Sequence, residues 1–189
     1  MLSSLRAQEN RIVMAYAINI RSDDASSFAV EALWREHELL EINPSMQALA
    51  YRPHITFAVY DTIATDQLQR TFEYAFEETK SITLRFEELQ YFESPQGFVL
   101  WLKPVASSEL SVLHEKIHSA IDPVLSREHY RPNSWVPHCS TATAIKADKK
   151  DQVLAVVKQG IQPFEVVFDV ADYVSFVPVE ILHEKWLAY

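Results

Sequence analysis

Hydrophobic and polar residues follow two different periods along the chain, which predicts strands interleaved with helices. Short apolar runs rich in β-branched and aromatic residues are typical of strands, whereas apolar residues recurring every three or four positions mark one face of a helix. Strands are predicted over residues 12–20, 52–60, 98–102, 136–145, 166–170 and 174–179, and a further strand begins over residues 82–86. Helices are predicted over residues 25–41 and 148–158, from a cap at Thr65, and from Ser107 or Ser108 to a stop before Pro123.

The order of these predicted elements repeats once. Each half of the chain reads strand, helix, strand, helix, strand, and the second half begins near residue 98. An internal repeat of this kind predicts two similar lobes that face one another. No linker rich in Pro, Ser or Gly separates the halves, so we expect residues 1–189 to form a single bilobal domain.

A four-residue pattern stands at the corresponding place in each predicted lobe. The two copies are Pro53-His54-Ile55-Thr56 and Pro137-His138-Cys139-Ser140. Side chains alternate along a strand, so each His shares a face with the hydroxyl two positions later. The same alternation places small residues on the face of the histidines: Ala58 in the first copy, and Ala142 and Ala144 in the second. The opposite face of the strand carries Ile55, Phe57 and Val59 in the first copy, and Cys139, Thr141 and Ile145 in the second.

Two imidazoles that face each other across a cleft form an acid–base pair. One can be neutral and accept a proton while the other is charged and donates one, because histidine titrates near neutrality. Two hydroxyls beside them can hydrogen-bond the non-bridging oxygens of a phosphate held between the rings. In-line attack on a phosphodiester needs this arrangement and requires no metal. A single His-x-Thr is ordinary strand sequence, but two copies at matching places favour a functional site.

The paired tetrads resemble the signature of the 2H phosphoesterases, a superfamily that includes bacterial 2'-5' RNA ligase-like proteins and cyclic nucleotide phosphodiesterases. The resemblance extends over most of the chain and includes the strand-like segment Phe98-Val99-Leu100-Trp101-Leu102-Lys103-Pro104. It implies a bilobal α+β fold with two pseudo-symmetric lobes, antiparallel sheets around a central cleft and helices on the outside. It also implies that His54 and His138 are catalytic and that Thr56 and Ser140 bind phosphate. The family's substrates are 2',3'-cyclic phosphates, ADP-ribose cyclic phosphate and 2'-5' linked nucleotides.

Composition narrows the class of substrate. The chain carries 17 Lys and Arg against 26 Asp and Glu, a net charge of −9, which removes the long-range attraction toward DNA or long RNA. A small nucleotide or a short RNA end is therefore the expected partner. Arg52, Arg131 and Lys146 are the cations near the tetrads in sequence, and we expect Arg52 to contact the substrate. Tyr60 shares the strand parity of His54 and is expected to stack on a base.

The small numbers of cysteines and glycines and the hydropathy of the chain exclude several other classes of protein. The one cysteine, Cys139, excludes an internal disulfide and a cysteine-based structural zinc site, and 2 glycines exclude a Gly-rich nucleotide loop. Residues 1–11 lack the apolar region of a signal peptide, and no apolar run is long enough to span a bilayer. We expect a cytoplasmic monomer with no cofactor, no metal and no membrane partner.

Two other functions remain open at this point. His114-Glu115-Lys116-Ile117-His118 matches the His-Glu-x-x-His motif of zinc hydrolases, although Lys116 would place a cation beside the metal. A boundary helix is the simpler interpretation, and His37, His129 and His183 are likewise expected at the surface or its boundary. The other alternative is a noncatalytic nucleotide- or RNA-binding module. The sequence leaves open which motif histidine is acid and which is base, and whether the enzyme hydrolyses or ligates.

Overall fold

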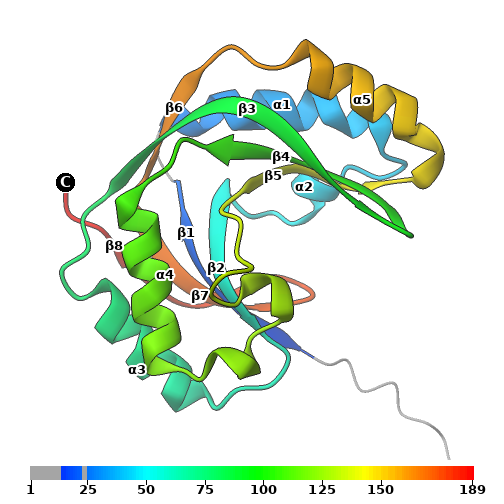
Figure 1. Cartoon of the computed structure of the whole chain (residues 1–189). Coiled ribbons are helices and arrows are strands. Elements are labelled where there is room, and N and C mark those ends of the chain that lie inside the picture. Colours follow the sequence, from blue (N-terminus) through cyan, green and yellow to red (C-terminus); the bar gives the residue numbers. More distant parts are fainter. Residues whose placement is uncertain (1–13, 23–24) are drawn as a thin grey trace, which may run out of the picture.

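The computed structural model describes residues 14–22 and 25–189, and within them the chain forms two four-stranded antiparallel sheets (Figure 1). The strands are β1 (Ala15–Arg21), β2 (His54–Tyr60), β3 (Ile82–Ser94), β4 (Gly97–Pro104), β5 (Cys139–Ile145), β6 (Phe164–Phe168), β7 (Val170–Phe176) and β8 (Glu180–Trp186). The α-helices are α1 (Phe28–His37), α2 (Ser45–Ala48), α3 (Thr65–Phe76), α4 (Ser108–Ala120) and α5 (Lys150–Gln159).

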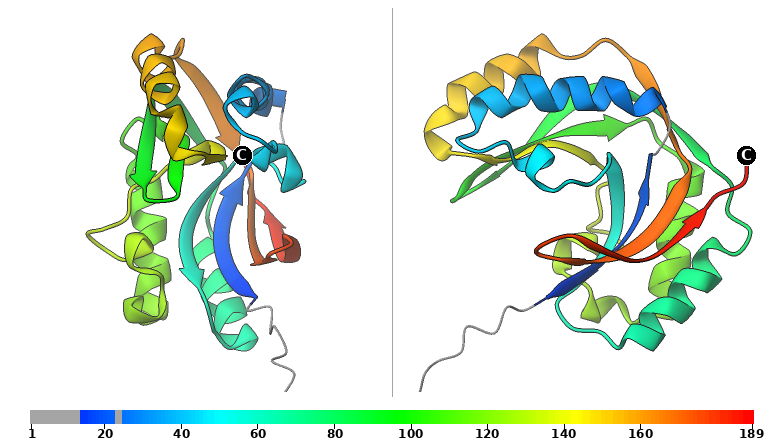
Figure 2. Two further views of the ribbon diagram at one scale, coloured as in Figure 1. Left: turned by 90° about the vertical axis from the view of Figure 1, so that its right-hand side faces the viewer. Right: turned by 180° about the vertical axis from the view of Figure 1, so that it is seen from behind.

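The β1 sheet has the order β2-β1-β7-β8, and the β4 sheet has the order β5-β4-β3-β6. The predicted α+β class with antiparallel sheets and outer helices is confirmed. Helices α3 and α4 pack on the β1 sheet, while α1, α2 and α5 pack on the β4 sheet, and Figure 2 shows these two helical layers on the outside. Each sheet therefore buries one face beneath helices, as its apolar strands require.

The two lobes are not the two halves of the sequence. Strand β3 comes from the first half but pairs with β4, and β7 and β8 come from the second half but extend the sheet of β1. Helix α1 of the first half likewise packs against β5, and α4 of the second half packs against β2. The chain thus crosses between the lobes several times, and one buried apolar cluster contains residues of both sheets, such as Ile18 and Leu100.

The order of elements follows the prediction, and the differences lie at strand ends and edges. Strand β8 was not predicted, because it is an edge strand whose residues are nearly all exposed and show no apolar alternation. Helix α3 begins after Ala64, which makes no side-chain cap, so the predicted cap at Thr65 is wrong. Ser107 does cap α4, where its hydroxyl accepts a hydrogen bond from the Leu110 amide at 3.2 Å. The start of the first predicted strand and residues 1–11 lie outside the described residues.

A glycine fixes the hairpin that joins β3 to β4. Gly97 has φ of +141°, and a Cβ atom there would lie 1.9 Å from the backbone oxygen of Ile145 on β5. Only glycine accommodates both the backbone angle and the close approach. Gly97 therefore lets the hairpin lie tightly against the strand that follows one motif histidine.

Candidate active site

The two motif histidines lie at the start of two edge strands that contact each other. His54 is the first residue of β2, and His138 directly precedes β5. Strands β2 and β5 are edge strands of their sheets and contact each other (Figure 1). Both imidazoles are partly buried. The positive charge of His54 contributes to lowering the pKa of His138, which means that the two rings lie within electrostatic range of one another.

The same backbone contact orients both rings. The Nδ1 atom of His54 lies 2.9 Å from the carbonyl oxygen of Arg52, and Nδ1 of His138 lies 2.7 Å from that of Val136. A carbonyl only accepts hydrogen bonds, so each Nδ1 carries the hydrogen and each Nε2 is the acceptor atom of a neutral ring. Burial lowers the pKa of both imidazoles. Each ring is therefore prepared to take a proton at Nε2, or to give one from Nε2 once charged.

The surroundings of the two rings differ. The edge of Tyr51 contacts His54 with ring centroids 4.9 Å apart. His138 instead meets Phe92 at 5.2 Å and Trp101 at 5.8 Å, and these two aromatic rings stack on each other at 4.6 Å. His54 thus has a phenol as its aromatic neighbour, whereas His138 has a phenyl ring and an indole.

A β-bulge follows the hydroxyl residue in both motif strands. In β2, Thr56 pairs with Asn19 and Ala58 pairs with the adjacent Ile18, which leaves Phe57 as the extra residue. In β5, Ser140 pairs with Trp101 and Ala142 with Leu100, which leaves Thr141 as the extra residue. A bulge of one residue reverses the alternation of side chains beyond it.

This reversal corrects three predictions about the motif face. Tyr60 is fully buried in the core, where its hydroxyl has no partner among the described residues, so it cannot stack on a base. Ala58 and Ala142 also lie in the core rather than beside the ligand. Val59, expected in the core layer, instead lines the cavity next to His54.

An indole N–H holds the carbonyl of each motif hydroxyl residue. Nε1 of Trp135 donates to the oxygen of Thr56 at 2.9 Å, and Nε1 of Trp34 donates to the oxygen of Ser140 at 3.0 Å. These bonds satisfy backbone oxygens beside the bulges, where the strand pairing is irregular. The two tryptophans therefore fix the backbone that carries the motif hydroxyls.

A buried polar network supports the first motif. Asp172 on β7 is fully buried and accepts hydrogen bonds from Tyr51 at 2.6 Å, Arg21 at 2.9 Å and Asn19 at 3.1 Å. Asn19 in turn accepts the hydroxyl of Thr56 at 2.8 Å. Burial raises the pKa of the Asp172 carboxyl and of the Tyr51 phenol, although the partners of Asp172 oppose the rise in its own pKa. The sequence analysis did not predict a role for these residues. The feature that indicates them is the presence of polar residues inside otherwise apolar strands.

A cavity of about 260 Å³ adjoins His54 and Thr56. Its lining contains Asn19, Tyr51, Tyr130 and Thr143 as further polar residues, and among the described residues no Lys, Arg, Asp or Glu lines it. The apolar walls come from Ala17, Leu49, Val59, Val174, Phe176, Val177 and Val179. The cavity can therefore enclose an uncharged, partly apolar group beside the imidazole.

The cations that lie near the tetrads in sequence are directed elsewhere. Arg52, predicted to contact the substrate, makes an ion pair with Glu31 of α1 at 2.8 Å and lies outside the lining of this cavity. Arg131 donates to the backbone oxygen of Ser126 at 2.8 Å, and Lys146 is exposed at the end of β5. The structure therefore places the Arg52 guanidinium against α1, and its contact with a substrate stays a prediction.

The His-Glu-x-x-His segment lies on α4 and supports β2. His114 and His118 are buried, whereas the prediction placed them at the boundary, and Glu115 is exposed. Nε2 of His114 donates to the Tyr130 oxygen at 2.8 Å, and Nε2 of His118 lies 3.4 Å from the oxygen of Phe57. Within the described residues, no group of three His, Cys, Asp or Glu could hold a metal ion. The pair thus binds backbone carbonyls, which does not favour the zinc hydrolase.

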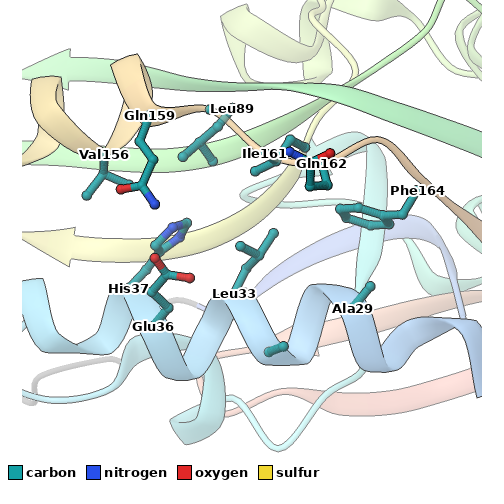
Figure 3. A pocket seen from close by; sticks show the side chains of 12 residues that line it. Ala29, Leu33, Glu36, His37, Leu89, Val156, Gln159, Ile161, Gln162 and Phe164 are labelled. Atoms are coloured by element: carbon teal, nitrogen blue, oxygen red, sulfur yellow. The ribbon is translucent and has the colours of Figure 1, made fainter.

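His37 is also buried rather than at the surface. Its Nδ1 atom lies 2.8 Å from the hydroxyl of Thr141, the bulge residue of β5. Figure 3 shows His37 and Glu36 of α1 facing Gln159 of α5 across a second cavity of about 330 Å³. This cavity shares no described lining residue with the one beside His54.

Among the described helices, none is both long and apolar enough to cross a membrane.

Comparisons with known proteins show the family to which the chain belongs. The family model of the 2'-5' RNA ligase superfamily matches residues 24–175, so the chain belongs to that superfamily, the 2H phosphoesterases. A Bacillus licheniformis protein named "Putative phosphoesterase" is 27% identical over 120 residues, which cover 62% of this chain and 68% of that protein.

Solved structures share the fold at low identity. Escherichia coli LigT, crystallised with 3'-AMP, is 15% identical with a TM-score of 0.58, and the match covers 93% of this chain and 98% of LigT. A Thermus thermophilus protein is 14% identical with a TM-score of 0.55, over 92% of this chain and 97% of its own. Family membership supports phosphodiesterase chemistry in general.

Proposed function

We propose that this protein is a metal-independent phosphodiesterase that acts on a 2',3'-cyclic phosphate, an ADP-ribose cyclic phosphate or a 2'-5' linked nucleotide by two-histidine acid–base catalysis. The observation that carries the proposal is the matched anchoring of His54 and His138 through Nδ1, which leaves both Nε2 atoms for chemistry. Their position on contacting edge strands of two sheets supports a reacting phosphate between them.

The proposed reaction uses one neutral and one charged imidazole. The neutral ring takes a proton from water as the water oxygen bonds to phosphorus, and the charged ring protonates the ribose oxygen that leaves. Mutual repulsion between the rings favours a state with one proton shared between two sites. We expect a bell-shaped pH profile, with both limbs displaced to acid because burial lowers the pKa of both groups.

The lining of the cavity favours a small substrate with few charges. Among the residues that the structure describes, none in its walls carries a charged side chain other than the imidazole of His54 itself, which suits a nucleobase or sugar better than a polyphosphate. The crystal structure of LigT with 3'-AMP shows a nucleoside monophosphate bound to a protein of this fold. The net charge of −9 also disfavours a long nucleic acid.

The test is chromatographic analysis of 2',3'-cyclic nucleotides incubated with the protein in the presence of a chelator. Wild type should form a single nucleoside monophosphate isomer, and His54→Ala and His138→Ala should each lower kcat by about 1000-fold while retaining the native circular dichroism spectrum. His183→Ala, a change at an exposed histidine of β8, is the matched control and should keep the wild-type rate. Wild-type rates in either motif variant would refute the proposal, and tight nucleotide binding without product would favour the noncatalytic module instead.

A further inference from the structure

A second cavity lies between helices α1 and α5, with strand β3 contributing to its lining (Figure 3). It has a volume of about 330 Å³ and shares no described lining residue with the cavity beside His54. A cavity of this size can enclose a small organic molecule. The proposed reaction uses none of the residues that line it, so any ligand it holds would have a separate role.

One end of this cavity is polar and the rest of its lining is mostly apolar. Figure 3 shows Glu36 and His37 of α1 facing Gln159 of α5 at the polar end. The other walls are apolar and extend to Phe164, with Gln162 as the one further polar side chain among the described lining residues. A ligand that matches this distribution has a polar head and an apolar body.

His37 brings an unused hydrogen-bonding atom to the polar end. The residue is 1% exposed, and its Nδ1 atom lies 2.8 Å from the hydroxyl of Thr141. Its Nε2 atom has no hydrogen-bond partner in the part of the chain that the structure describes. Burial lowers the pKa of this imidazole, which favours the neutral ring. A ligand that donates a hydrogen to Nε2 would therefore satisfy a polar atom that the protein itself leaves unpaired.

The charges around the polar end favour a cation. The exposed Glu36 carboxylate makes no ion pair with a described side chain, and no Lys or Arg is among the described lining residues. Helices α1 and α5 end at His37 and Gln159, so the partial negative charge of both C-termini lies at this end. Arg35 and Lys158, in the last turns of these helices, are exposed and lie outside the lining. An ammonium group therefore suits this end better than a carboxylate or a phosphate.

We propose that this cavity is a second binding site, for a small primary amine with an apolar body, and that His37 links its occupancy to strand β5. The ammonium group donates to Nε2 of His37, to the Glu36 carboxylate and to the amide oxygen of Gln159, while the body packs along the apolar walls. A donor at Nε2 requires the tautomer with the hydrogen on Nδ1, which then donates to Thr141. Thr141 is the extra residue of the bulge that directly follows Ser140. Binding thus fixes the hydrogen bond that holds this bulge against α1.

Calorimetric titration with three probes of nearly equal shape tests the head group. The probes are 2-phenylethylamine with an ammonium group, 2-phenylethanol with a hydroxyl and 3-phenylpropionate with a carboxylate. The amine should bind with a Kd of about 1 mM or tighter, the alcohol at least about tenfold more weakly, and the carboxylate not at all. Equal affinity for the amine and the alcohol, tighter binding of the carboxylate, or no binding of the amine at about 10 mM would overturn the proposal.

Variants of the lining test where the amine binds. Glu36→Gln removes the carboxylate and should weaken amine binding about tenfold while changing the affinity for the alcohol by less than about twofold. Ala32→Trp fills the cavity from an exposed helix position and should abolish amine binding while keeping the native circular dichroism spectrum. Glu115→Gln, at an exposed position of α4 outside this lining, is the matched control and should bind the amine like wild type. Wild-type affinity in Glu36→Gln or in Ala32→Trp would refute the site.

Nitrogen-15 NMR tests the link to β5. The resonances of the two ring nitrogens of His37 distinguish the tautomers, and with the amine bound Nδ1 should carry the hydrogen and Nε2 should not. The backbone amide resonance of Thr141 should shift on saturation, whereas that of His183 on β8 should not. A hydrogen on Nε2 in the complex, or an unchanged Thr141 resonance, would refute the link. These readouts need no turnover, so their failure is distinct from a failure of the proposed function.

Discussion

Trp135→Phe isolates the contribution of the indole N–H beneath the first motif. The indole ring stacks on His114 at 4.1 Å with an interplanar angle of 4° and lies 5.5 Å from Phe57, and its Nε1 donates to the Thr56 oxygen at 2.9 Å. Phenylalanine keeps a stacking ring but cannot donate. The Thr56 oxygen then loses its partner beside the bulge, and a half-buried carbonyl left unpaired costs about 1–3 kcal/mol.

Urea unfolding followed by far-ultraviolet circular dichroism measures this cost independently of tryptophan fluorescence. With a slope of about 2 kcal/mol per molar urea, the midpoint should fall by about 0.5–1.5 M. The rate should also suffer, because the same backbone segment carries the Thr56 hydroxyl and displacements of about 1 Å cost up to about 100-fold in catalysis. We expect kcat on a 2',3'-cyclic nucleotide to fall at least about tenfold.

Two further tryptophans provide the comparison. Trp34→Phe removes the corresponding bond to the Ser140 oxygen and should have effects of similar size. Trp186 is 58% exposed on β8, and Trp186→Phe should leave the urea midpoint and kcat unchanged. If Trp135→Phe behaves like Trp186→Phe in both measurements, the indole bond does not hold the bulge and the reasoning is wrong.

Three further predictions concern a turn, a buried histidine and the cysteine. Gly97→Ala forces a Cβ atom to 1.9 Å from the Ile145 oxygen and should lower the free energy of unfolding by about 2–4 kcal/mol in urea, whereas Gly160→Ala, at a site with open space, should cost about 1 kcal/mol. Burial lowers the pKa of His114 to about 4 from an ordinary 6.5, so the unfolded chain takes up the proton first as the pH falls. The free energy of unfolding should therefore drop by about 3 kcal/mol between these two pH values, a loss that His114→Phe should reduce. Cys139 is 1% exposed and burial raises the pKa of its thiol to about 12, so a thiol-specific disulfide reagent should react only after unfolding; rapid reaction with the folded protein would contradict its burial.

The sequence was sufficient to predict the order of the strands and α-helices other than α2 and β8. Strands β1, β2 and β4 are apolar runs that are buried along most of their length, and helices α1, α3 and α4 carry apolar residues that are buried on one face. The exchange of β3, β7 and β8 between the halves could not be read from the same pattern. Partner choice among antiparallel strands depends on the whole fold, because each strand buries the same kind of apolar face wherever it pairs.

The error at Tyr60 has a definite physical origin. The strand parity predicted from His54 holds through Thr56 and fails at Phe57, where the bulge adds one residue against β1. A bulge depends on the partner strand, on Trp135 and on His118, all distant in sequence. Parity arguments are therefore sound over two residues and unsafe over six, which is why the motif hydroxyl was placed correctly on the face of its histidine and Tyr60 was not.

The duplicated motif does not by itself distinguish its two histidines, whereas their surroundings in the fold do. Both imidazoles are anchored through the same atom to the same relative carbonyl, so the motifs themselves give no reason for one to be acid and the other base. The difference must come from neighbours that the repeat does not copy. Asp172 lies on β7, next to β1 and away from the β4 sheet, and the pairing of β1 with β7 brings it to Asn19 and Tyr51. The pairing of β1 with β7, which the repeat does not predict, thus places a buried carboxylate network behind the first motif.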